Sequence, residues 1–182
     1  MLEVAARLLE ESGMEAVTLR AVGERAGVSR QAPYNHFADK ATLLSVLAAR
    51  YLQRLGEGMA EAAKGAGDDP FEGLGAMMEA YVRFALENPS RYRLIGQEMS
   101  GSSHGEVHEA ARAVNARFVG VVAACQEAGE LPGEDPLELA AILFATTHGA
   151  VELTLSGHAE EEKGLGDPAK LVRALLARLR RD

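Results

Sequence analysis

The sequence predicts an all-α protein of about nine helices, and three observations lead to this prediction. Ala, Leu, Glu and Arg are abundant, whereas Trp is absent and aromatic residues make up only 5% of the 182 residues. This composition favours helices over strands. Apolar residues recur at spacings of three and four, the period of an amphipathic helix. Gly, Pro and Asp cluster between the periodic segments, where helices end.

Two short helices are expected at the start of the chain. The apolar residues from Leu2 to Leu9 lie at helical spacing, and Gly13 follows as a C-terminal stop. Thr18 is a good N-cap for the second helix, and Gly27 ends that helix. The sequence therefore predicts two helices joined to the next segment by a tight turn.

A third short helix and a long fourth helix are expected next. Ser29 is the expected N-cap of the third helix, with Val28, Tyr34 and Phe37 as its apolar anchors. Pro33 lacks an amide hydrogen, so we expect this helix to start late or to bend. The fourth helix is expected to cover about residues 40–64.

The rest of the chain is expected to form a longer helical body. The stretch KGAGDDP at 64–70 is the clearest break, and ENPS at 87–90 interrupts the next helix. The remaining helices are expected near residues 71–87, 90–99, 107–125, 137–155 and 171–179. From Leu137 to Leu155 apolar residues occur on every side, so this helix needs cover on more than one face. The last two helices therefore indicate a twofold subunit interface, for which we expect Phe144, Val151, Leu155, Leu171, Leu175 and Leu179.

Charge is unevenly distributed along the chain. The formal net charge is -8, from 19 Lys/Arg and 27 Asp/Glu. Residues 1–50 hold six of each sign, which leaves 13 basic and 21 acidic residues in the remaining 132. Nonspecific adhesion to nucleic acid should therefore be poor, and DNA binding would depend on a few well-placed donors near the N-terminus.

The segment after Gly27 carries side-chain types that match the edges of DNA bases. Two short helices joined by a Gly-containing turn are typical of a helix-turn-helix, whose second helix enters the major groove. Arg30 matches guanine, and Gln31 and Asn35 match adenine. The alternative is a solvated helical hairpin with scattered polar residues. The spacing alone leaves both possibilities open.

Residues 6–47, ARLLEESGMEAVTLRAVGERAGVSRQAPYNHFADKATLLSVL, resemble the DNA-binding head of the TetR/AcrR family of transcriptional regulators. The resemblance implies a homodimer with a helix-turn-helix DNA-binding domain at 1–47 and a ligand-binding and dimerisation domain at 48–182, linked by the fourth helix. It assigns base reading to Arg30, Gln31 and Asn35, and phosphate contacts to donors around them. The full set expected to contact DNA is Thr18, Arg20, Ser29, Arg30, Gln31, Tyr34, Asn35, His36 and Lys40.

The body is expected to bind a small apolar effector, because the family carries a ligand pocket there. Methionine and aromatic side chains suit such a pocket, although they are equally typical of a plain core. The candidate ligand-binding residues are Met77, Met78, Tyr81, Phe84, Met99, Phe118, Phe144 and His148. Residues 87–95 and 144–153 are similar to a TetR subgroup with a Trp-His-Gly motif, which reads Thr147-His148-Gly149 here.

Other chemical readings carry less support. Residues 101–105 fit the letters of the G-x-S-x-G hydrolase motif, but helices are expected on both sides and the motif needs a strand. His104 and His108 stand four residues apart, and a metal site there competes with a solvated helix start. His148 fits a satisfied buried polar pair with Glu152, or a contact to a ligand or at the dimer axis.

The sequence as a whole predicts a ligand-responsive repressor that binds a palindromic operator as a homodimer. No enzyme activity, cofactor, metal or membrane partner is expected. The single cysteine and the absence of an apolar run near 20 residues indicate a cytoplasmic protein. The alternatives are a helical protein-interaction module with a vestigial head and an all-helical enzyme.

Overall fold

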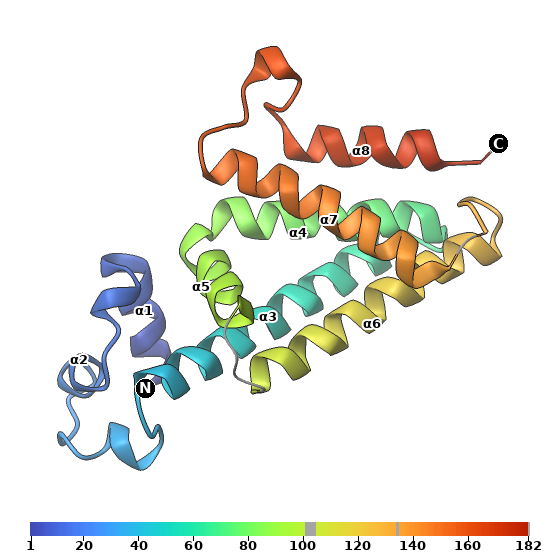
Figure 1. The fold of residues 1–182 in the computed structure, drawn as a ribbon. Coiled ribbons are helices and arrows are strands. Elements are labelled where there is room, and N and C mark those ends of the chain that lie inside the picture. Colours follow the sequence, from blue (N-terminus) through green and yellow to red (C-terminus); the bar gives the residue numbers. More distant parts are fainter. Residues whose placement is uncertain (101–104, 134, 182) are drawn as a thin grey trace. The chain divides into compact units, whose positions relative to one another are not determined.

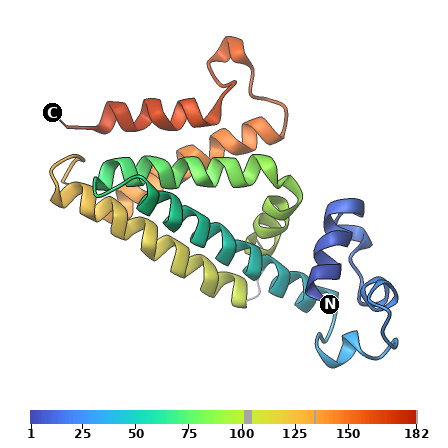
Figure 2. The same cartoon turned by 180° about the vertical axis from the view of Figure 1, so that it is seen from behind.

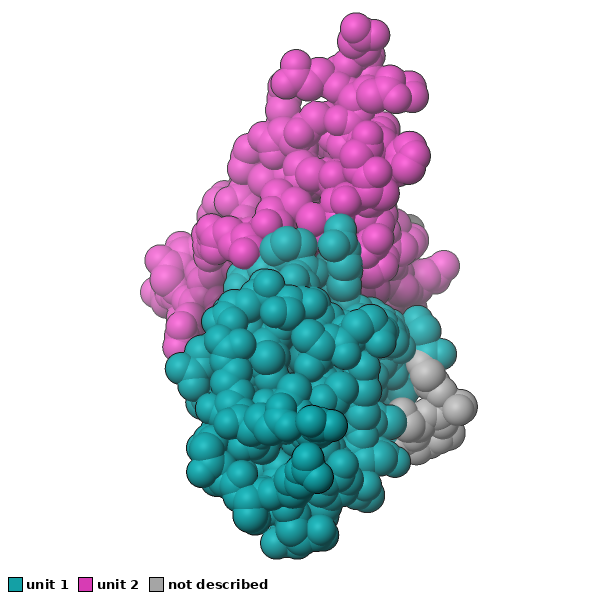
Figure 3. All heavy atoms as spheres, turned by 90° about the vertical axis from the view of Figure 1, so that its left-hand side faces the viewer, with its two compact units in different colours: residues 1–54, 88–112 teal, residues 55–87, 113–182 magenta. Residues whose placement is uncertain are grey.

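The computed structural model describes residues 1–100, 105–133 and 135–181. In these ranges the chain forms eight α-helices, three short 3-10 turns and no β-strand (Figure 1), which confirms the all-α prediction. The chain divides into two compact units (Figure 3). Unit 1 comprises Met1–Arg54 and Asn88–Arg112, and unit 2 comprises Leu55–Glu87 and Ala113–Asp182.

Unit 1 begins with two short helices, α1 (Leu2–Ser12) and α2 (Leu19–Arg25), with a 3-10 turn at Met14–Ala16 between them. Gly13 ends α1 with a φ of 78°, a conformation that costs glycine little. The Thr18 side chain accepts a hydrogen bond of 3.1 Å from the Ala21 amide and so caps α2. Both predictions for these helix ends are confirmed.

The long helix α3 (Lys40–Gly65) contributes residues to both units. The Asp39 carboxylate accepts hydrogen bonds from the Thr42 amide at 2.7 Å and the Thr42 hydroxyl at 2.8 Å, which satisfies a free amide at the start of the helix. The helix ends at Gly65, within one residue of the predicted end and at the start of the Gly- and Asp-rich stretch that precedes α4.

The helix α5 (Pro89–Ser100) also belongs to unit 1, together with the first residues of α6 (Glu106–Glu127). Arg91 on α5 donates to Glu10 on α1, with a distance of 2.8 Å from Nε. Its guanidinium also lies 5.3 Å from the centre of the Tyr51 ring of α3. Arg91 thus ties three helices of unit 1 together.

Unit 2 contains α4 (Pro70–Glu87), α7 (Pro136–Leu155) and α8 (Pro168–Leu179), and each of these helices packs against the other two (Figures 1 and 2). Each of these helices starts with the pair Asp-Pro. The Asp side chain accepts from amides of the first turn, and proline fits the first helical position because it has no amide to satisfy. A 3-10 turn at Glu161–Lys163 separates α7 from α8.

The second halves of α3 and α6 complete unit 2 and pack very closely. A Cβ built on Gly56 of α3 would lie 2.5 Å from Cγ2 of Val114 on α6. Any larger residue at Gly56 would therefore force Val114 or one of the two helices to shift.

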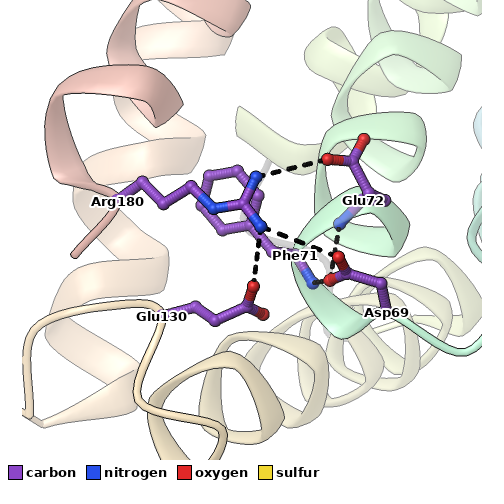
Figure 4. A network of polar contacts seen from close by, with 5 residues as sticks. All are labelled: Asp69, Phe71, Glu72, Glu130 and Arg180. Atoms are coloured by element: carbon purple, nitrogen blue, oxygen red, sulfur yellow. Dashed lines mark hydrogen bonds and ion pairs between the residues drawn. The ribbon is translucent and has the colours of Figure 1, made fainter. Parts of the chain in front are cut away.

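Arg180, just after α8, fastens the end of the chain to unit 2 (Figure 4). Its guanidinium lies 2.9 Å from Glu130, 3.4 Å from Glu72 and 3.7 Å from Asp69. It also lies 4.3 Å from the centre of the Phe71 ring. One cation therefore links the end of α8 to the start of α4 and to the segment that follows α6.

None of the helices in the described ranges combines the length and the apolar character that crossing a membrane requires.

Candidate nucleic-acid interface

The turn after α2 has the backbone geometry that the sequence predicts, but not the predicted packing. Gly27 adopts a φ of 68°, as the reversal demands. Val28 and Tyr34 were expected to be apolar anchors of the third helix, and that prediction is wrong, because 43% of Val28 and 50% of Tyr34 are exposed. Pro33 is the buried residue that packs on α2 at this point.

Where the sequence predicts the third helix, the structure has a 3-10 turn at Pro33–Asn35. We call residues 29–36, which contain this turn, the reading segment. The Ala32 amide donates to the Ser29 carbonyl at 3.0 Å, and the His36 amide donates to the Pro33 carbonyl at 3.1 Å. These bonds span three residues, the spacing of a 3-10 turn. The predicted α-helix capped by Ser29 is therefore wrong: Pro33, which has no amide to donate, begins a short 3-10 turn without a side-chain cap instead.

The reading segment presents its polar side chains to solvent. Arg30, Gln31 and Asn35 are exposed, and half of Tyr34 is exposed. Phe37, the next residue, is buried and anchors the segment to the core of unit 1. The segment thus has an apolar side that holds it in place and a polar side that can contact a partner.

Arg30 differs from most basic residues near it in having no acidic partner. All six basic residues of positions 1–50 lie in the described part of the chain, and four form ion pairs there: Arg20 with Glu24, Arg25 with Glu11, Lys40 with Glu15 and Arg50 with Glu3. Among these described residues, Arg7 and Arg30 have no ion pair. The charge of Arg30 is therefore free to meet an anion.

The expected phosphate donors lie around the reading segment. Arg20 Nε is 2.8 Å from Glu24, and both side chains are mostly exposed. Lys40 Nζ is 3.4 Å from Glu15. Exposed ion pairs of this kind are worth little in water, so a phosphate can replace the carboxylate. Thr18, Ser29 and His36 complete the set, with Thr18 half-buried and the other two exposed.

The candidate ligand-binding residues are divided between the two units. Met77, Met78 and Tyr81 on α4 and Phe118 on α6 are buried in unit 2. Phe84 and His148 are half-buried, Phe144 is exposed, and Met99 is an exposed residue of unit 1.

A small aromatic cluster joins α4 and α7 in unit 2. The Tyr81 hydroxyl and His148 Nδ1 form a hydrogen bond of 3.0 Å. The Phe144 ring stacks on the His148 ring, with centroids 5.5 Å apart, and meets the Tyr81 ring edge-on at 5.8 Å. His148 thus has Tyr81 as one partner. The pairing of His148 with Glu152 stays a prediction.

The outer face of α7, which spans about half of the helix circumference, exposes large apolar side chains along its two edges. Leu137, Ile142 and Leu153 are exposed together with Phe144, although only Phe144 was among the expected interface residues. Val151 is fully buried inside the chain, whereas Leu155, Leu171, Leu175 and Leu179 are half-buried. The sequence did show that apolar residues occur on every side of this helix, which could have pointed to Leu137, Ile142 and Leu153. It did not show which side of the helix stays uncovered.

Two sequence motifs fall partly outside the described residues. The G-x-S-x-G stretch lies there except for Gly105, and so does His104 of the possible metal pair. Among the described residues, no group of three or more His, Cys, Asp or Glu side chains is placed to hold a metal ion.

Comparison with known proteins agrees with this geometry. The family model for bacterial regulatory proteins, tetR family, matches residues 1–47. YobS, an uncharacterized HTH-type transcriptional regulator of Bacillus subtilis (strain 168), is 29% identical over 92 residues, 50% of this chain and 47% of YobS. FasR, an HTH-type transcriptional activator of Mycolicibacterium smegmatis, is 30% identical over 95 residues, 52% of this chain and 43% of FasR. The chain thus spans about half the length of the curated relatives it matches.

The rest of the chain is also matched. A solved structure of a protein with unknown function from Rhodococcus sp. RHA1 has a TM-score of 0.85 and 30% identity, and the alignment covers 97% of this chain and 90% of that one. The family model described as tetracyclin repressor-like, C-terminal domain, matches residues 74–179, more than half of the chain. The Trp-His-Gly subgroup stays a prediction. The chain belongs to the tetR family of bacterial regulatory proteins.

Proposed function

We propose that the protein is a DNA-binding transcription regulator whose reading segment contacts base edges in the major groove. One observation carries the proposal: Arg30, Gln31 and Asn35 are exposed on a short segment that follows α2, and Arg30 has no acidic partner in the described chain. These side-chain types make bidentate contacts to guanine and adenine. We place the regulator in the cytoplasm, the compartment that holds the DNA.

The phosphate contacts are part of the same proposal. We assign them to Thr18, Arg20, Ser29, Tyr34, His36 and Lys40. On binding, Arg20 would leave its ion pair with Glu24, and Lys40 would leave its ion pair with Glu15, and each would contact a phosphate oxygen instead. Because the net charge is -8, the regulator would bind DNA weakly wherever the base contacts are missing.

The proposed regulator acts as a homodimer whose interface includes the outer face of α7. Leu137, Ile142, Phe144 and Leu153 leave more apolar surface exposed on this one helix than isolated surface residues account for. The half-buried leucines of α8 extend the surface, whereas Val151 is left out because it is already buried. Twofold symmetry would present two reading segments to half-sites roughly 34–36 Å apart on a palindromic operator.

The domain division completes the proposal, with DNA binding at 1–47 and ligand binding and dimerisation at 48–182. The methionine and aromatic side chains of α4, α6 and α7 are suited to a small apolar effector. A repressor would then release DNA when the effector favours a conformation with lower affinity, and a coupling of about 1–3 kcal/mol is enough for regulation.

Selection from random double-stranded DNA tests the proposal. We expect recovery of a palindrome, followed by a loss of affinity of about tenfold or more for Arg30→Ala and a further loss when Gln31→Ala is added. Arg93→Ala is the matched control, since it removes an exposed charge from α5 and should change binding little. Failure to recover any sequence would favour a protein-interaction module, and unchanged binding by the double variant would rule out these readers.

A further inference from the structure

Gly23 on α2 and Pro33 in the reading segment fit together with no space between them. A Cβ built on Gly23 would lie 3.0 Å from Pro33 Cγ and 3.5 Å from Pro33 Cδ. The first distance is shorter than a comfortable contact between carbon atoms. Both residues are buried, although most of their neighbours in sequence are exposed or half-buried. The absence of a side chain at Gly23 is what allows the ring to approach α2.

Pro33 fastens the reading segment to α2. Pro33 is the buried residue of the segment 29–36, whereas Ala32 before it is half-buried and Tyr34 after it is exposed. A proline ring is bonded to its own backbone nitrogen, so the ring cannot move without the backbone. A displacement at this contact would therefore be transmitted directly to the base-reading residues next to it.

Two hydrogen bonds at the end of the segment are accepted by the same residue. The Pro33 carbonyl accepts from the amides of His36 at 3.1 Å and Phe37 at 3.0 Å. The Asn35 amide donates to the Ala32 carbonyl at 3.3 Å. Asn35 is therefore tied to Ala32, whose carbonyl carbon is bonded to the Pro33 nitrogen. Because Pro33 carries its ring on that nitrogen, a shift of the ring moves the backbone on both sides, where Arg30, Gln31 and Asn35 lie.

We propose that Gly23 and Pro33 are a matched positioning pair that determines operator specificity. This inference rests on the proposed function, because it concerns the residues that would read the operator. Hydrogen bonds to base edges weaken steeply as their geometry departs from the ideal, so a shift of a few tenths of an ångström in the segment reduces specific binding. Contacts to phosphates carry no sequence information and tolerate such a shift better.

The test compares wild type, Gly23→Ala, Pro33→Ala and the double variant on the selected palindrome and on scrambled DNA of the same length. We expect Gly23→Ala to lower affinity for the palindrome about tenfold, the scale of one base contact, with little change on scrambled DNA. In the Pro33→Ala background the same glycine change should cost less than about twofold, because the ring that the new methyl would strike is gone. Alanine is the better helix former, so weakening of α2 cannot explain the loss.

The outcomes separate positioning from folding. Circular dichroism and thermal unfolding of each variant report the fold, and the ratio of the two DNA affinities reports positioning. Equal affinities for wild type and Gly23→Ala would overturn the proposal, as would an equal cost of that change in both backgrounds. If Gly23→Ala does not fold, the proposal still predicts that the double variant folds and binds DNA like Pro33→Ala. A double variant that does not fold, or that binds differently, would contradict the proposal. Absence of any selected palindrome for wild type refutes the proposed function itself, and the pair then has no role.

Discussion

Cys125 illustrates how burial controls the chemistry of one residue. The side chain is fully buried on α6. Burial, with the carboxylates of Glu130 and Asp69 nearby, raises the pKa of the Cys125 thiol to about 12. Because the thiolate is the reactive form, the thiol should be inert in the folded protein at neutral pH.

We therefore expect Cys125 to react with an aromatic disulfide reagent only after unfolding. A rise in pKa from 9.0 to about 12 lowers the thiolate fraction about a thousandfold, and burial blocks access as well. The measurement compares labelling rates at pH 8 with and without denaturant. Cys125 is the single cysteine, so every labelled molecule reports this site. Rapid stoichiometric labelling of the native protein would contradict the assigned burial.

Asp39 makes stability depend on pH through the start of α3. The hydrogen bonds from the Thr42 amide and hydroxyl lower the pKa of the Asp39 carboxyl below its ordinary value of 3.8. A lowered pKa in the folded state means that the stabilisation is fully present above the unfolded value. It is then lost as the pH falls through the folded value.

Comparison of wild type with Asp39→Asn isolates this contribution. Asparagine keeps an oxygen that can accept from Thr42 but does not titrate. We expect the difference in melting temperature between the two proteins to shrink as the pH falls from 6 to 3, because only the wild type loses a charged cap. A constant difference across this range would show that Asp39 does not titrate as its contacts imply.

Helix caps and glycines with positive φ could be predicted from the sequence, whereas the exposure of Val28 could not. Thr18 and Gly27 were placed correctly, because an N-cap and a positive φ depend on a few neighbouring residues. Val28 was expected to be buried and is not, because Pro33 packs on α2 instead. Which of two apolar side chains fills a junction depends on how the segments pack, and spacing does not determine that.

At the scale of elements, Gly56 and Gly58 lie on the same helix but differ in the space that an added side chain would find. Both lie within α3, where glycine is a poor helix former. A Cβ at Gly56 would lie 2.5 Å from Val114 Cγ2, whereas nothing lies within 4 Å of a Cβ at Gly58. The same substitution should therefore have opposite effects at the two positions.

We expect Gly58→Ala to raise the free energy of unfolding by up to about 1 kcal/mol through helix propensity. Gly56→Ala should lower it by about 1–3 kcal/mol, the usual cost of overpacking. Urea unfolding followed by circular dichroism measures both values. Adding Val114→Ala to Gly56→Ala should recover part of the loss. Stabilisation by Gly56→Ala alone would mean that α3 and α6 do not pack as described.

Most helix boundaries could be predicted because their signals are local. The Gly- and Asp-rich stretch before Pro70 and the apolar period from Val107 to Cys125 place α4 and α6 within a few residues. The third helix was the exception, since Pro33 limits it to a 3-10 turn. The ion pairs of Arg180 could not be predicted from local sequence, because its three carboxylate partners come from two distant parts of the chain.

For the whole molecule, the exposed face of α7 leads to a prediction about assembly. We expect Ile142→Glu to shift the protein from dimer to monomer, because it places a charge in the proposed apolar interface. Size-exclusion chromatography with light scattering measures the mass, and operator affinity should fall with it. Leu86→Glu on α4 is the control, since Leu86 is also an exposed leucine but lies outside that face. A monomeric wild type would contradict the proposed dimer.

The sequence by itself determined the helical class, the caps and breaks that delimit most helices, and the polar residues after Gly27. Each of these follows from composition or from a few neighbouring residues. Only the tertiary structure decided that Pro33 packs on Gly23, that Arg30 has no acidic partner in the described chain, and which side of α7 stays uncovered. These features depend on which side chains meet across distant or differently oriented segments, and that is settled when the helices pack against one another.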